Sequence, residues 1–251
     1  MKAPGVIRVE NLTVCHERRP AVHHLSGQFA PGSLTAIVGP NGTGKTTLLR
    51  ALAGLHKPQE GRIRAADRVA LLPQASSLDR SFPIACLDAV MLGLWRQTGA
   101  FRAVAPAGRA QAEAALEAVG LRGFQRRPVG SLSAGQFQRV LFARLLVQDA
   151  PVILLDEPFN ALDARTAAEM LALVKAWHGE GRTVVAVLHD MELVQRDFPE
   201  TLLLARDPIG WGPTAEVLTA ANRLRARQMA EGWAEDAADC DLASTTMDRA
   251  A

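Results

Sequence analysis

Short, continuously apolar runs are the clearest pattern along this chain. Residues 34–38, 152–155 and 184–188 are apolar at nearly every position. A strand that is apolar along its length is covered on both faces, as in a parallel sheet. A mixture of polar and apolar positions at residues 7–14 predicts an additional early strand. The pattern therefore predicts an α/β protein built around a parallel sheet.

Helical spacing occurs between these runs. After Gly44, leucines recur at helical spacing in residues 45–55, so a strand, a glycine-rich turn and a helix follow one another. Strand-like runs disappear between residues 75 and 130, where Ala, Leu and Arg dominate, which predicts an inserted helical subdomain. Residues 221–251 are rich in alanine and acidic residues and predict a helical or flexible tail. We therefore expect one domain over residues 1–220, which contains the insertion.

Length and composition narrow the classes of function. A chain of 251 residues has room for one large domain with a subdomain, since domains commonly span roughly 100–200 residues. The formal net charge of +2 is too small to indicate a nucleic-acid partner. No signal peptide is evident, and no apolar stretch approaches the roughly 20 residues that span a bilayer. We expect a cytoplasmic protein whose contact with a membrane comes through a partner.

A phosphate-binding loop lies between the first buried strand and the helix that follows it. Glycines let the backbone wrap a β-phosphate with its N–H groups pointing inward, and the helix N-terminus adds positive charge. Lys45 would neutralise the β- and γ-phosphates, Thr46 would offer its hydroxyl to Mg²⁺, and Thr47 joins the nucleotide-binding set. The pattern G-x-x-x-x-G-K-[ST] is matched by Gly39, Pro40, Asn41, Gly42, Thr43, Gly44, Lys45 and Thr46.

Two carboxylates follow the second buried strand. Asp156 and Glu157 precede Pro158, at the carboxyl edge of the predicted sheet, which faces the phosphates. Asp156 can hold a hydrated magnesium ion, and Glu157 is placed to orient and deprotonate an attacking water. Seen alone, such a pair would more often be a helix cap or a surface pair. The upstream phosphate loop favours the catalytic interpretation.

A third motif precedes the acidic strand and discriminates among nucleotide-binding families. Ser133 is placed as an N-cap and Gln136 as the third helical residue of a capping box, which opens a helix with an apolar face. The motif consists of Leu132, Ser133, Ala134, Gly135 and Gln136. It resembles the LSGGQ signature of ABC transporter ATP-binding subunits. In that family this helix end closes on the ATP held by the other subunit, so two chains enclose two nucleotides.

Further motifs follow in the order of the ABC family. Gln74 resembles the glutamine that senses magnesium and water, Asp163 resembles the D-loop aspartate, and His189 resembles the switch histidine at the γ-phosphate. The resemblance implies a P-loop NTPase (RecA-like) core with an N-terminal antiparallel β subdomain and an α-helical subdomain. It implies ATP and Mg²⁺ as cofactors, with Thr46, Gln74 and Asp156 around the metal. Glu157, His189 and Gln74 form the expected catalytic set.

Two departures from the family pattern concern the nucleotide. Ala134 replaces the first glycine of the signature pair, and Gly135 remains to let backbone approach a phosphate. The family usually stacks adenine on an aromatic ring after the first strand, yet the chain contains no tyrosine. Alignment places His16 at that point, where an imidazole can stack on the base. The alternative is that His16 is exposed to solvent and adenine is held elsewhere.

The segment after Gln74 bears on which transporter the chain would serve. Residues 76–84 and 88–94 resemble the zinc/manganese importer branch, and residues 156–163 and 212–218 are compatible with it. This implies a homodimer of ATPase subunits, an integral-membrane permease and, indirectly, a substrate-binding protein. The subunit would lie peripherally on the cytoplasmic face of the inner membrane, without a nucleic-acid partner. Iron-chelate or haem importers are close alternatives.

A soluble ABC clamp of translation or DNA maintenance is an alternative from another class. Such proteins usually carry two ATPase domains in tandem or a long coiled-coil insertion. This chain has room for one ATPase domain and lacks sustained heptads. Co-purification with a membrane subunit would separate the two hypotheses.

Overall fold

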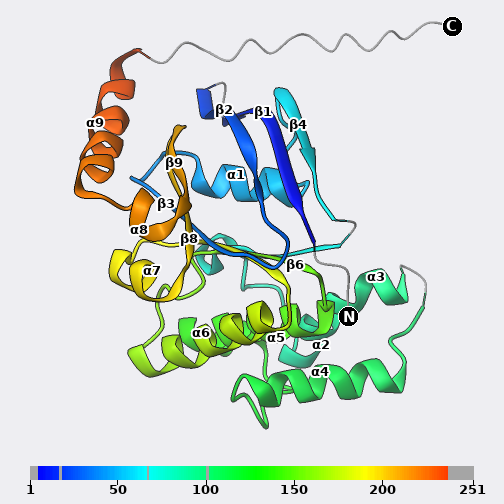
Figure 1. Ribbon diagram of the computed structural model, residues 1–251. Coiled ribbons are helices and arrows are strands. Elements are labelled where there is room, and N and C mark those ends of the chain that lie inside the picture. Colours follow the sequence, from blue (N-terminus) through cyan, green and yellow to red (C-terminus); the bar gives the residue numbers. More distant parts are fainter. Residues whose placement is uncertain (1–4, 17–18, 67, 100–101, 237–251) are drawn as a thin grey trace, which may run out of the picture.

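The strands form two sheets, with helix α1 packed between them in the computed structural model (Figure 1), which describes residues 5–16, 19–66, 68–99 and 102–236. The smaller sheet has the order β2-β1-β4, and its neighbours are antiparallel. It is the antiparallel unit near the N-terminus that the family resemblance implied. The bounds are β1 (Ile7–His16), β2 (Arg19–Phe29), β4 (Glu60–Arg64) and α1 (Lys45–Leu52).

The larger sheet has six strands in the order β5-β6-β7-β3-β8-β9. Its first five strands are parallel, which confirms the parallel core. Strand β9 runs antiparallel to β8 because Arg206 alone separates them, and so short a connection cannot make a crossover. The bounds are β3 (Leu34–Val38), β5 (Val69–Leu72), β6 (Val152–Asp156), β7 (Thr183–Val187), β8 (Glu200–Ala205) and β9 (Asp207–Pro213).

Alternate residues of the central strands face two different hydrophobic clusters. In β6, Val152 and Leu154 join the cluster that contains α1, β1 and β2. Ile153 and Leu155 join the cluster that contains α5 (Ala134–Gln148) and α6 (Ala164–Gly179). Each strand is thus covered on both faces, which is why its sequence is apolar without alternation.

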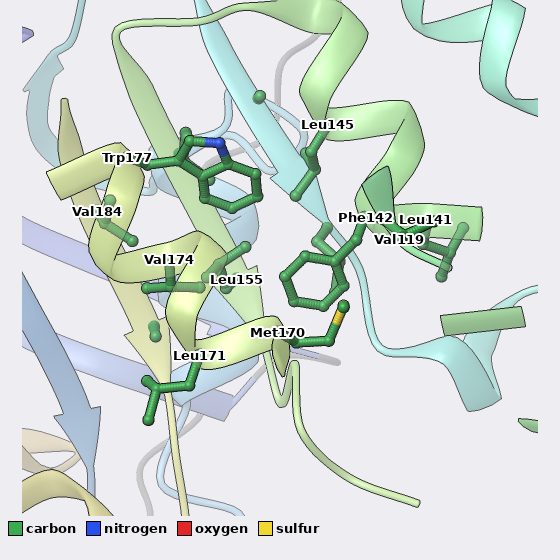
Figure 2. Packing of buried hydrophobic residues seen from close by; sticks show 14 of the residues in the cluster. Val119, Leu141, Phe142, Leu145, Leu155, Met170, Leu171, Val174, Trp177 and Val184 are labelled. Atoms are coloured by element: carbon green, nitrogen blue, oxygen red, sulfur yellow. The ribbon is translucent and has the colours of Figure 1, made fainter. Parts of the chain in front are cut away.

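Helices α5 and α6 pack their large side chains together over the sheet (Figure 2). Phe142 of α5 stacks beside Trp177 of α6, with ring centroids 6.0 Å apart and planes at 14°. Met170 and Leu155 fill the space beside these rings in the same view. This contact fixes α5, and therefore its N-terminal signature residues, relative to the acidic strand β6.

The described residues between 75 and 130 form short helices joined by turns and irregular segments, with one isolated bridge between Ala85 and Pro128 and no strand among them. In Figure 1 these helices lie at the end of the molecule opposite the antiparallel sheet. Treating them as a separate subdomain remains a prediction. The helical elements are η1 (Ala75–Ser77), α2 (Cys86–Met91), η2 (Leu92–Leu94), α3 (Trp95–Thr98), α4 (Pro106–Ala118) and η3 (Val129–Ser131).

Helix α1 is shorter than the spacing of its leucines predicts. Helix α1 stops at Leu52, since Gly54 turns the chain at φ 74°, and Leu55 is left 70% exposed.

Helix α9 (Ala220–Asp236) begins the predicted tail, and its Ala226 is buried in the main cluster. Residues 237–251 lie outside the described part of the chain. The remaining helices are α7 (Met191–Asp197) and α8 (Thr214–Val217).

None of the helices within the described ranges is long and apolar enough to cross a membrane.

Candidate functional site

The phosphate loop connects β3 to α1, as the motif requires. Gly44 has φ 85°, and a Cβ at this position would come within 2.0 Å of the Ala21 carbonyl oxygen. A Cβ on Gly39 would meet the Leu204 carbonyl oxygen at 1.9 Å. Only glycine fits these positions, so the loop passes tightly between β2 and β8 and opens into the helix N-terminus.

Lys45 holds its ammonium group inside this loop. Its Nζ donates to the carbonyl oxygens of Gly39, at 2.9 Å, and Pro40, at 2.7 Å, and the residue is 6% exposed. Burial lowers the pKa of Lys45, while the carboxylates of Glu157 and Asp156 act in the opposite direction. A buried cation at the N-terminus of a helix makes the loop a suitable binding place for an anion.

Asp156 ends β6 beside the first helical turn of α1. The Thr46 hydroxyl donates to Asp156 Oδ1 at 3.1 Å, and Asp156 is 2% exposed. Burial raises the pKa of Asp156, and the hydrogen bond from Thr46 offsets part of this shift. A carboxylate and a hydroxyl side by side form the hard oxygen set that suits Mg²⁺.

Glu157 brings the three expected catalytic residues together. Its Oε1 lies 2.8 Å from His189 Nε2, and its Oε2 accepts from Gln74 Nε2 at 2.8 Å. The Asn160 amide also donates to Oε2, at 2.5 Å. Glu157 itself has φ 50°, and its backbone N–H donates to the Val187 carbonyl at 3.2 Å. The acid is therefore held at the carboxyl edge by Gln74, which follows β5, by Val187 and His189 at the end of β7, and by Asn160 of its own turn.

A cleft of about 740 Å³ runs along this edge of the sheet and joins the loop to Glu157 and His189. Five of the lining residues were not among the expected site residues: Pro20, Ala21, Arg50, Asn160 and Arg206. Arg206 had a signal in the sequence, because it follows a parallel strand at the same edge. The lining residues are Pro20, Ala21, Asn41, Gly42, Thr43, Gly44, Lys45, Thr46, Thr47, Arg50, Glu157, Asn160, His189 and Arg206.

The signature residues form the expected capping box but lie outside this cleft. The backbone N–H of Gln136 donates to Ser133 Oγ at 3.2 Å, and the Ser133 N–H donates to Gln136 Oε1 at 3.1 Å. Ala134 and Gly135 open helix α5, and none of residues 132–136 lines the cleft. Ser133 Oγ accepts in this cap, so its O–H is left to donate outward.

A buried polar residue of the signature helix contacts the acidic loop. Gln138 of α5 is 2% exposed, and its Nε2 donates to the Pro158 carbonyl at 2.9 Å.

Asp163 caps α6 by accepting from the backbone N–H and hydroxyl of Thr166, which lowers the pKa of Asp163. In a single chain Asp163 is therefore a helix cap, and its D-loop role remains a prediction.

His16 is the last residue of β1, and its side chain lies outside the described part of the structure. Stacking of adenine on His16 therefore remains a prediction. None of the residues described as lining the cleft is Phe or Trp, so no other aromatic ring of these types takes that place there.

Comparisons with known proteins agree with this geometry. Residues 22–160 match the family described as ABC transporter. The manganese transport system ATP-binding protein MntB of Listeria monocytogenes is 36% identical over 221 residues, which cover 85% of this chain and 92% of that protein. The zinc transport system ATP-binding protein TroB of Treponema pallidum is also 36% identical, covering 85% and 83%.

Solved structures give the same result. An inward-facing structure assigned to the metal-chelate type of ABC transporter has a TM-score of 0.79 and 31% identity, with 88% of each chain covered. A dimeric, post-hydrolysis ATP-binding cassette, MJ0796 with ADP and Pi, has a TM-score of 0.73 and 26% identity, covering 83% of this chain and 98% of that one. The expected P-loop NTPase fold is confirmed.

Proposed function

Because this chain belongs to the ABC transporter family and is an ATP-binding, ATP-hydrolysing cassette, we propose that it powers the import of a divalent metal ion, zinc or manganese. The observation that carries this proposal is the pair of relatives named for manganese and zinc, each matching 85% of the chain. The metal is cargo for the membrane partner. This chain supplies the energy.

Nucleotide and magnesium fit the residues at the sheet edge. The loop N–H groups and Lys45 would bind the β- and γ-phosphates, and Thr46, Asp156 and Gln74 would hold Mg²⁺. When bound, the ion would neutralise negative charge on the phosphates. Asp156 and Thr46 are already in contact, which supports their place in the ion site.

Glu157 is the proposed general base. It lies in the same cleft as Lys45 and contacts His189, the proposed partner of the γ-phosphate. A carboxylate so placed can take a proton from a water aligned with the terminal phosphate. Hydrolysis would then open the closed dimer, and the opening would be passed to the permease.

A second copy of the chain would complete the site. Ser133 and Gly135 lie at an exposed helix N-terminus outside the chain's own cleft, with N–H groups that suit a phosphate. The dimeric cassette bound to ADP and Pi is a structural precedent for such pairing. We infer a homodimer in which each signature faces the nucleotide of the other chain.

A groove of about 720 Å³ beside the helical insertion suits the permease. Leu55 and Trp95, both on its lining, are 70% and 57% exposed. Four arginines also line the groove (Arg50, Arg68, Arg96 and Arg144), and no Asp or Glu occurs among its described lining residues. Burial lowers the pKa of Arg144, which favours a carboxylate partner. The fitting occupant is a permease helix that carries apolar and acidic side chains.

The groove also adjoins the catalytic residues. Pro73 and Ser77 line it, and Gln74 between them donates to Glu157. A helix that moves in the groove would move Gln74 and change the contacts of the base. This proximity supports a subunit that lies peripherally on the cytoplasmic face of the inner membrane. A substrate-binding protein would act through the permease.

Uptake by the reconstituted transporter tests the proposal. The chain, its permease and its binding protein are placed in proteoliposomes, and uptake of radioactive manganese and zinc is measured with ATP on the side of this chain. We expect ATP-dependent uptake of one metal and none with K45A. The metal-chelate structure at 31% identity makes an iron chelate the second candidate cargo. Uptake of the chelate alone would contradict the assigned metal, and association with ribosomes or DNA without a permease would contradict transport.

A further inference from the structure

The Glu157 carboxylate receives its three hydrogen bonds unevenly. Two amide groups, from Gln74 and Asn160, donate to Oε2, whereas His189 alone approaches Oε1. A carboxylate oxygen offers about two lone-pair positions for hydrogen bonds. Oε2 is therefore fully used, and Oε1 keeps one position open. The carboxylate presents only one of its two oxygens to a further donor.

We propose that Asn160 is a positioning residue, which holds Glu157 Oε2 so that Oε1 faces the attacking water. Asn160 lines the nucleotide cleft together with Glu157 and His189, so the turn that carries it lies at the reaction site. The inference rests on the proposed function, in which Glu157 is the base. Gln74 donates to the same oxygen, but it belongs to a different segment, next to the groove residues Pro73 and Ser77.

Asn160 does not line the permease groove, and its position is set by its own turn. Its backbone N–H donates to the Glu157 carbonyl at 3.3 Å, so both residues belong to one tight turn. Gln138 anchors that turn from α5 through the Pro158 carbonyl. Lys45, Asp156 and His189 are the charged or titratable groups that face Glu157 from α1, β6 and the end of β7. Asn160 thus keeps the carboxylate oriented even when Gln74 moves.

The chemical step assigned to Oε1 is balanced. An O–H bond of the water breaks and its proton passes to Oε1, while the water oxygen forms a bond to the γ-phosphorus. The bond from that phosphorus to the bridging oxygen breaks, and its electron pair leaves with ADP. Inorganic phosphate is released, and the proton returns from Oε1 to phosphate or solvent.

An Asn160→Asp substitution tests whether Asn160 orients the Glu157 carboxylate or only supports its own turn. Aspartate supports the same kind of turn as asparagine, but its carboxylate cannot donate to Oε2 and repels it. In the reconstituted transporter we expect N160D to lower kcat about 10-fold or more, with the KM for ATP within about 2-fold, because orientation and not binding is lost. N160S, which keeps a hydroxyl donor, should recover part of that kcat.

Three controls make the result decisive. N222D makes the same change at an amide that bonds the Val217 carbonyl, and it should leave kcat unchanged. Direct ATP binding by N160D shows that the cleft is folded. N160D in an E157Q background should add no further loss, because its effect passes through the carboxylate.

The outcomes also separate this inference from the proposed function. A wild-type kcat in N160D, or equal losses in kcat and ATP binding, would overturn the positioning role. If E157Q alone keeps full turnover, the proposed base is wrong, whatever N160D does.

Discussion

The nucleotide cleft is assembled within one chain, whereas the signature residues at the start of α5 lie outside that cleft. Lys45, Glu157 and His189 come from three separate segments, yet they line a single cleft, and Asp156 lies beside it through its hydrogen bond with Thr46. The signature residues form a capping box whose hydrogen bonds are made within the motif. Among the described residues, none of them forms a hydrogen bond with the residues of the cleft. The cleft is already assembled within the chain, whereas the signature residues form a surface that, in the proposed dimer, would act on the nucleotide of the second chain.

The largest expected effect is a loss of turnover when Glu157 in the cleft is replaced. Glu157→Gln keeps the shape and the donors around the side chain but removes the base, so kcat should fall about 10²- to 10⁴-fold while ATP still binds. Turnover and ATP binding are measured on the same sample, and size-exclusion chromatography with ATP should show a trapped dimer. Normal turnover would exclude Glu157 as the base.

A mixture of two inactive chains sharpens the comparison further. K45A lacks a phosphate ligand in its own cleft, and S133A lacks the signature hydroxyl that a partner would use. A mixed dimer contains one site with both Lys45 and Ser133, so mixing should restore activity well above that of either variant alone. S131A is the matched control, because Ser131 bonds only the Pro128 carbonyl nearby. No recovery on mixing would mean that the two regions do not share a site.

The smallest effect is a change in stability. Burial raises the pKa of Asp156, so ionised Asp156 destabilises the folded chain as pH rises above the ordinary aspartate range. Asp156→Asn keeps an acceptor for Thr46 without the charge. With magnesium chelated, D156N should have a higher Tm than the parent at neutral pH, and the difference should shrink as the solution is acidified. A difference that is constant with pH would contradict this cause.

Much of both regions could be predicted from short-range pattern. The phosphate loop needs glycines beside Ala21 and Leu204, and the capping box of α5 needs only Ser133 and Gln136 three residues apart. Continuous apolar runs predicted the central strands because each is buried on both faces. These features depend on neighbours in the sequence or on burial alone.

Other features depend on contacts that no local pattern carries. The family resemblance pointed to Gln74 as a magnesium ligand, and the structure adds its bond to Glu157, a residue 83 positions later. Asn160 was hidden because an amide three residues after an acid is common in turns.

The buried amide of Gln138 connects the signature helix α5 to the loop that follows Glu157. Helix α5 begins with the signature, which is proposed to contact a partner's nucleotide, and through Gln138 it also bonds the turn beside Glu157, the proposed base. In a two-chain assembly, ligand occupancy at one nucleotide would therefore bias the geometry at the other. By thermodynamic linkage that influence must be mutual. The two sites of such a dimer are expected to bind ATP with coupled affinities, which an ATP-binding titration would show as a Hill coefficient different from one.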